Sequence, residues 1–208
     1  MLRLHSGLWL TFGLLAQPVA GQDIATAGLG HDLGEPDARV LVVELLDFGC
    51  SACAQFTRET MPRLMKEYVE TGLVRWRALP FSAGFANGKE AARASECAAD
   101  QGSFWAMHDL LYERQKEWER ERDPRARYEA YAAEVGLDPI GFTACYRLAN
   151  VDERRERNDR VAREVGVPGT PAFVIGEQRI VGAVPYELFK QYLDRAIAAA
   201  GGGRRSPR

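Results

Sequence analysis

The sequence has few Cys and His residues, the usual ligands of structural zinc, with four Cys and three His among 208 residues. It has no large excess of one charge, since 27 Lys and Arg stand against 29 Asp and Glu, which excludes a globally basic nucleic-acid-binding protein. The pair Gly28 and Gly30 lacks the preceding strand and third glycine of a dinucleotide-binding loop. The length also excludes repeat arrays and large multidomain enzymes. What remains is an ordinary globular domain, with 46% hydrophobic residues.

The N-terminal apolar run from Leu8 to Ala16 is too short to span a bilayer. It follows Arg3 and precedes the small residues of Val19-Ala20-Gly21, a pattern typical of a secretory signal peptide over residues 1–21. The alternatives are an uncleaved anchor or a buried helix, and the Gly and Pro in and just after the run disfavour both. We therefore expect a periplasmic or otherwise extracytoplasmic protein, where four Cys favour disulfide chemistry.

A β-α-β unit is predicted after a lead-in segment over residues 22–37. Val40 to Leu46 is apolar without alternation, as in a strand buried on both faces. A helix that ends at Gly72 and is kinked by Pro62 is expected next, because apolar residues recur at helical spacing at Met61, Leu64, Met65 and Tyr68. Residues 74–80 then alternate as a second strand.

Residues from about 87 to 164 are helical in character and predict a helical insertion. Its charge-dense part, 113–127, mixes both signs and is interpreted as a solvated helix face without an assigned function. Two short β-rich runs, 172–175 and 179–181, indicate a hairpin, and a last apolar stripe from Leu188 to Ile197 predicts a helix. We therefore expect one domain over residues 38–200, followed by a disordered basic tail over 201–208.

Cys50-Ser51-Ala52-Cys53 lies where the buried strand meets the helix. At a helix N-terminus the unpaired N–H groups and the helix dipole favour the thiolate of Cys50, and Cys53 one turn later could close a reversible disulfide with it. A zinc site is the alternative for this spacing. It would need a second close ligand pair, yet Cys97 and Cys145 are far apart in the chain and the histidines are scarce. We expect a redox pair, with neither metal nor cofactor.

Glu44 is the only ionisable residue of its apolar strand. Burying an unpaired carboxylate costs several kcal/mol or forces its protonation, so a role for Glu44 in passing a proton to or from Cys53 is predicted. The alternative is a bulge or sheet edge that points Glu44 to solvent.

Two further features concern the remaining cysteines and prolines. Thr170-Pro171 precedes the hairpin, and a cis peptide bond there would expose the backbone of Thr170 to a substrate. The alternative is an ordinary trans proline in a loop.

Cys97 and Cys145 both fall in helical segments, so a structural disulfide between them is expected, with free buried thiols as the alternative.

Together these residues resemble the exported thioredoxin-fold oxidoreductases of the DsbA type. The likeness extends from about residue 34 to 198 and is carried by Val42-Val43-Glu44, Asp47-Phe48, the Cys50–Cys53 motif, Glu96 to Gly102 with Phe104-Trp105, and Gly166 to Phe173. The resemblance implies an α/β thioredoxin fold with an inserted helical domain. It also implies that Cys50 is the exposed attacking cysteine, Cys53 its resolving partner, Glu44 the buried carboxylate and Pro171 a cis-proline facing the disulfide.

The sequence departs from the strongly oxidising members, which carry Pro-His between the cysteines where this chain has Ser51-Ala52. In having Thr170 before the proline, the chain resembles disulfide isomerases more than the best-known oxidase of this type. We interpret the chain as a monomeric thiol-disulfide oxidoreductase that donates disulfides to exported proteins and is recycled by a membrane redox partner. A reductase or isomerase is the alternative within this chemistry, and a redox-inert or metal-binding thioredoxin-like module is the alternative outside it.

Overall fold

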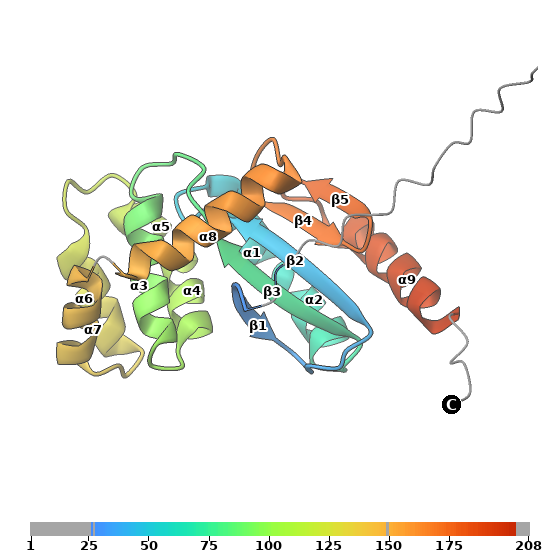
Figure 1. Ribbon diagram of the computed structural model, residues 1–208, viewed down its shortest axis with the longest axis horizontal. Helices are drawn as coiled ribbons and strands as arrows, with labels where there is room; N and C mark the ends of the chain where they lie inside the picture. Colours follow the sequence, from blue (N-terminus) through green and yellow to red (C-terminus); the bar gives the residue numbers. More distant parts are fainter. Residues whose placement is uncertain (1–25, 27, 149, 203–208) are drawn as a thin grey trace, which may run out of the picture.

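A five-stranded sheet in the order β1-β3-β2-β4-β5 organises the fold (Figure 1). The computed structural model describes residues 26, 28–148 and 150–202. Strands β2 and β3 run parallel and all other neighbours are antiparallel. The strands are β1 (His31–Leu33), β2 (Val40–Leu46), β3 (Val74–Pro80), β4 (Ala172–Ile175) and β5 (Gln178–Val181). The predicted bounds of β2 and β3 are therefore those observed.

One face of the sheet is covered by α1 (Ser51–Glu59), α2 (Met61–Leu64), the π-helical turn η1 (Met65–Val69) and α9 (Tyr186–Gly202). Their core contains a group of aromatic rings, Phe56, Trp76, Phe173 and Phe189. The helix is interrupted at Thr60, and Pro62 lies in the first turn of the next helix, α2. Proline has no N–H to donate within a continuous helix, but the first turn of a helix needs no such donor, so a new helix can start there.

The opposite face is covered by α8 (Asn150–Val165), which packs Val161, Ala162 and Val165 against Val43 and Leu79. In Figure 1, α8 runs from the other helices of the insertion back across the sheet toward β4 and β5. Central strand β2 is thereby buried on both sides, as its unbroken apolar pattern predicts.

The helical insertion gathers at one end of the sheet (Figure 1). Besides α8 it comprises α3 (Gly88–Ala99), α4 (Phe104–Glu113), α5 (Gln115–Trp118), α6 (Arg125–Glu134) and α7 (Pro139–Arg147). Its apolar core is continuous with the end of β2, because Leu46, Phe48 and Cys53 pack in the same cluster as Leu111 and Trp118. The insertion therefore shares a core with the start of α1.

Three expectations need correction. The lead-in contains strand β1, which pairs with β3 and is too short to show strand periodicity in the sequence. The charge-dense stretch is not wholly a solvated face, since Gln115 is 3% exposed and Trp118 fully buried. Helix α9 continues through Gly202, so the expected disordered tail does not begin at 201.

The expected leader, residues 1–21, and the tail beyond 202 lie outside the described residues. None of the helices that the structure describes is long and apolar enough to cross a membrane.

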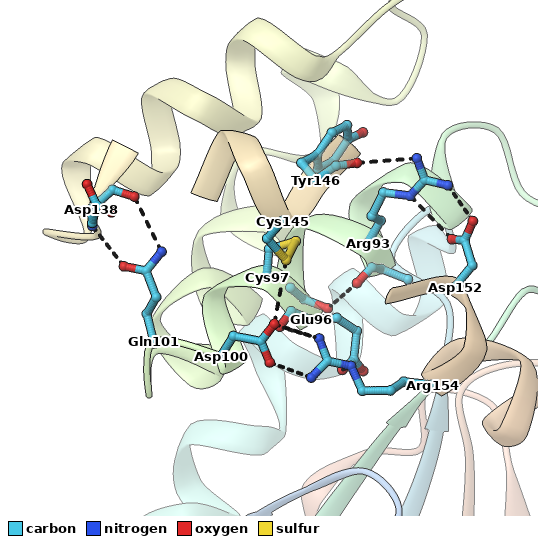
Figure 2. The surroundings of a disulfide bond; sticks show 12 residues. Arg93, Glu96, Cys97, Asp100, Gln101, Asp138, Cys145, Tyr146, Asp152 and Arg154 are labelled. Carbon is cyan, nitrogen blue, oxygen red and sulfur yellow. Dashed lines mark hydrogen bonds and ion pairs between the residues drawn. A yellow bond between two sulfur atoms is a disulfide. The ribbon is translucent and has the colours of Figure 1, made fainter. Parts of the chain in front are cut away.

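A disulfide joins Cys97 of α3 to Cys145 of α7, with a Cα–Cα distance of 5.7 Å (Figure 2). Ion pairs tie α3 and its C-cap residue to α8: Arg154 lies 2.5 Å from Asp100, and Arg93 lies 2.5 Å from Asp152. The disulfide and the ion pairs thus connect α3 to α7 and α8, which follow it by about 40 residues or more.

Removing this disulfide by Cys97→Ala with Cys145→Ala is expected to lower the free energy of unfolding by up to about 4 kcal/mol. The reason is the separation of 48 residues, whose closure restricts the unfolded chain. Urea unfolding would be compared in a Cys50→Ser, Cys53→Ser background, so that no other thiol can exchange. An unchanged unfolding midpoint would contradict the expectation.

Candidate functional site

Cys50 and Cys53 lie at the junction of β2 and α1. Cys50 is the N-cap residue of α1, with φ −78° and ψ 119°, and Cys53 follows in the first turn. Both are free thiols in the structure. We call residues 47–53 the cysteine turn. Its backbone is closed by a hydrogen bond from the N–H of Cys50 to the carbonyl oxygen of Asp47, at 3.0 Å.

The thiol of Cys50 has a pKa lowered to about 5. The largest cause is a hydrogen bond from the Cys53 side chain, and the backbone N–H groups of Ala52 and Cys53 add to it, while burial opposes it. The low pKa therefore arises without a charged residue between the cysteines. Cys50 is 3% exposed, so the expectation of an exposed cysteine is wrong, because other residues of the same chain cover it.

Cys53 has the opposite electrostatic environment. Burial raises the pKa of its thiol well above the ordinary value, and the thiolate of Cys50 and the carboxylate of Glu44 raise it further. A proton therefore stays on Cys53 while Cys50 ionises.

Glu44 lies in β2 opposite Ala78 of β3 and Phe173 of β4, and it is fully buried. Its Oε2 accepts a hydrogen bond of 2.7 Å from Nε1 of Trp76. Burial raises the pKa of this carboxyl, although His108 and Trp76 act to lower it. The side chain does not reach solvent through a bulge or an edge.

The peptide bond between Thr170 and Pro171 is cis. The carbonyl oxygen of Thr170 lies 3.4 Å from Sγ of Cys50, which donates to it as a thiol. Behind this turn, the carbonyl of Pro171 accepts a 2.7 Å hydrogen bond from the N–H of Gly182. The backbone of Thr170 thus lies directly beside the more acidic cysteine.

Asp47 connects the cysteine turn to the loop after β3. Its carboxylate accepts hydrogen bonds of 2.8 Å from the N–H groups of Gly49 and Ala83. Burial raises its pKa to about 6. The approach is so close that a Cβ atom on Gly88 would lie 1.9 Å from Oδ1 of Asp47, so only glycine fits at that position.

Two residues of the insertion hold the cysteine turn from the other side, and the sequence analysis singled out neither of them. Nε2 of Gln115 donates to the carbonyls of Phe48 and Cys50, at 2.6 and 3.0 Å. The hydroxyl of Tyr112 donates to the carbonyl of Asp47 at 3.3 Å. The available signal was the uncharged Gln115 within a charged stretch, which is the pattern of a buried polar residue.

The geometry combines an acidic thiol, a buried thiol that keeps its proton, and a buried carboxyl close to the second thiol. Such a set can undergo thiol-disulfide exchange, because the acidic thiol serves as nucleophile and leaving group. Over the described ranges, no group of three or more His, Cys, Asp and Glu side chains is placed to hold a metal ion.

Comparisons with known proteins agree with this fold. A family model described as thioredoxin matches residues 26–195. The Na(+)/H(+) antiporter NhaA of Herminiimonas arsenicoxydans is 34% identical over 84% of this chain, but the match spans only 28% of the antiporter. The chain thus corresponds to about a quarter to a third of the length of the antiporters it matches.

Two other proteins are matched over most of their length. The disulfide bond formation protein D of Bacillus subtilis is 23% identical, over 79% of this chain and 76% of its own. The crystal structure of alpha-DsbA1 from Wolbachia pipientis superposes with a TM-score of 0.72 and 21% identity, covering 82% of this chain and 92% of that one. Because the family model covers most of the chain, this protein belongs to the thioredoxin family, and its fold, with the helical insertion, is that of the DsbA proteins.

Proposed function

We propose that this protein is a thiol-disulfide oxidoreductase that donates disulfides to exported proteins through Cys50 and Cys53. The observation that carries the proposal is the opposite environment of the two thiols, which lowers the pKa of Cys50 to about 5 and raises that of Cys53. The similarity to a disulfide bond formation protein supports it.

The reaction begins when a substrate thiolate attacks Sγ of Cys50 in the oxidised enzyme. The bond between Cys50 and Cys53 breaks, its electron pair passes to Sγ of Cys53, and this sulfur takes a proton from the carboxyl of Glu44. A second substrate thiolate then attacks the substrate sulfur of the mixed disulfide, and Cys50 leaves as a thiolate. The substrate has lost two electrons, which the enzyme now holds as a dithiol.

Thr170 and Pro171 would bind the substrate in this scheme. The Thr170 backbone lies beside Sγ of Cys50, where it can hold an extended chain while the mixed disulfide exists. The lowered pKa of Cys50 favours the oxidase direction, because stabilising the thiolate stabilises the reduced enzyme and makes its disulfide a stronger oxidant.

The setting of this activity is also part of the proposal. The leader pattern over residues 1–21 and the disulfide between Cys97 and Cys145 support an extracytoplasmic location, with the periplasm as one such compartment. We further propose a monomer whose dithiol is reoxidised by a membrane redox partner.

The direction of exchange is tested by equilibrating the Cys50–Cys53 pair with glutathione and by comparing a reduced, unfolded substrate with a scrambled one. We expect a potential clearly above the value of about −270 mV found for reducing thioredoxins, and faster oxidation of the reduced substrate. Cys50→Ser should abolish both the oxidation of the reduced substrate and the recovery of the scrambled one. Preferential recovery of the scrambled substrate would instead assign an isomerase.

The acidity of Cys50 gives a second prediction. In the reduced protein, thiolate absorbance should appear with a midpoint near pH 5. In Cys53→Ala the midpoint should rise, because the largest stabilising hydrogen bond is removed. Cys50→Ala, which lacks the thiolate, serves as the control. A wild-type midpoint near the ordinary value of 9.0 would contradict the proposed activation.

Replacing Glu44 with Gln should slow exchange and stabilise the fold at neutral pH. The folded pKa of Glu44 lies above its ordinary value of 4.5, so the folded state holds the proton longer than the unfolded state. The free energy of unfolding therefore falls as pH rises above 4.5, until the folded pKa is passed, and the gain from Gln grows over that window. Urea unfolding between about pH 4 and pH 8 measures this gain.

The exposed Glu59 on α1 offers a matched control. Glu59→Gln should leave both the exchange rate and the pH dependence of unfolding as in the wild type. A Glu44→Gln variant that exchanges at the wild-type rate would assign Glu44 a structural role only.

A further inference from the structure

An open hollow of about 250 Å³ lies beside Cys50, and the exchange scheme above does not use it. The two residues next to Cys50 in the chain line it, together with the loop after β3 and the end of α5. We call it the turn hollow, and its lining includes Gly49, Ser51, Phe85, Lys116, Glu119 and Arg120.

The loop that carries Phe85 is fixed against the cysteine turn. The carboxylate of Asp47 accepts hydrogen bonds of 2.8 Å from the N–H groups of Gly49, in the turn, and Ala83, in the loop. A Cβ atom on Gly49 would lie 2.6 Å from Cβ of Phe85, so the turn and the loop are in direct contact. Two walls of the turn hollow therefore hold one arrangement.

Asn87 joins the same loop to the third wall. Its Nδ2 donates to the carbonyl oxygens of Trp118 and Glu121, at 2.9 and 2.8 Å. Its backbone φ of 53° lies in the left-handed region, which residues other than glycine seldom adopt. The walls are thus set before any ligand arrives, which lowers the entropy cost of binding there.

The lining of the turn hollow combines an aromatic surface with positive charge. Phe85 is 44% exposed. The side chains of Lys116 and Arg120 are 78% and 89% exposed, whereas that of Glu119 is only 14% exposed. Within the described residues Glu119 is the only ion-pair partner of either cation, at 3.1 and 3.7 Å. Two exposed cations therefore share one covered carboxylate, and the hollow presents net positive charge.

The position and the lining together indicate what the turn hollow binds. A polypeptide whose cysteine is joined to Cys50 must place the residues next to that cysteine near Gly49 and Ser51, because these flank Cys50. Aromatic rings pack favourably on the exposed ring of Phe85, and carboxylates are attracted to the two cations.

We propose that the turn hollow binds the substrate segment next to the reactive cysteine and favours segments that carry an aromatic and an acidic residue there. This inference rests on the proposed exchange at Cys50 and Cys53. Phe85, Lys116 and Arg120 are specificity-determining residues in this role.

A second groove, of about 550 Å³, is less suited to such a segment. It lies along α1, α2 and α4, and none of its lining residues belongs to the cysteine turn. Its lining includes three carboxylates, those of Glu70, Asp109 and Glu113, but only one cation, Arg58. Its charge would repel an acidic segment.

The first test uses four reduced peptides, each with two cysteines. They are identical except for the two residues before the first cysteine, which are Phe-Asp, Phe-Lys, Ala-Asp or Ala-Lys. The measured quantity is the rate at which each peptide reduces the Cys50–Cys53 disulfide and itself becomes a disulfide, divided by its rate with oxidised glutathione. This division removes the intrinsic reactivity of each peptide thiol. The Phe-Asp peptide should give the highest value with the wild type.

Removing the two cations should reduce the preference for the acidic peptides. In a Lys116→Gln, Arg120→Gln variant the ratio of Phe-Asp to Phe-Lys should fall about fivefold or more, because two exposed ion pairs are lost and Glu119 is left uncompensated. The matched control is Arg39→Gln with Lys66→Gln, which removes the same charge from exposed positions before β2 and in η1. The control should keep the wild-type ratio.

Removing the aromatic ring should reduce the preference for the aromatic peptides. In Phe85→Ala the ratio of Phe-Asp to Ala-Asp should fall about threefold or more, since contact between two rings stabilises the complex beyond simple burial. Ile140→Ala is the control, because Ile140 is an apolar residue that is 81% exposed on α7. It should leave this ratio unchanged.

The second test locates the bound segment. A mixed disulfide between Cys50 of a Cys53→Ala variant and a chemically activated Phe-Asp peptide with one cysteine would be studied by NMR. Nuclear Overhauser contacts are expected between the peptide ring and Phe85. Contacts to Met61 and Met65 in the second groove would overturn the inference.

Equal values for the four peptides with the wild type, or a ratio that falls as far in a control as in its matched variant, would overturn the inference too. A wild-type protein that oxidises none of the peptides would overturn the proposed function instead. The chemically prepared mixed disulfide would then still show whether the turn hollow holds the segment.

Discussion

The cysteine turn is held between two separate parts of the chain, and the chemistry of the site depends on this arrangement. From the insertion, Gln115 and Tyr112 bind carbonyl groups of the turn. From the second half of the sheet, Thr170 brings its carbonyl to Cys50, across 120 residues of sequence. Gln115 and Tyr112 bind backbone groups and so restrain the turn without constraining which side chains it carries, whereas Thr170 contacts the thiol of Cys50 itself.

The acidity of Cys50 is a consequence of this restraint. The stabilising groups are the thiol of Cys53, Thr170 and two N–H groups at the start of α1, all of which act only at short range and in a fixed direction. A charged residue between the cysteines is therefore unnecessary for a low pKa here. The same geometry keeps the proton on Cys53, so one turn of helix separates two thiols of opposite character.

Burial of Glu44 links function with stability. The carboxyl of Glu44 lies in the central strand on the face that carries the apolar residues Val42 and Trp76, and among the described residues only Trp76 donates a hydrogen bond to it. An apolar residue there would pack at lower cost, since burying an ionisable group is unfavourable. The strand bears this cost at a position whose charge raises the pKa of the second cysteine.

The motifs that resemble the DsbA type implied the thioredoxin fold. The sequence by itself determined the bounds of β2 and β3 and the placement of Cys50 at a helix start. These follow from local periodicity and helix-end chemistry, which act over a few residues. Only the tertiary structure decided the partners of those residues. The three-residue β1 carries too little pattern to be predicted, and Gln115 looks like a member of a charged stretch. The role of Gln115 arises from its contacts with the cysteine turn, and a contact between distant segments leaves no periodic signal in a single sequence.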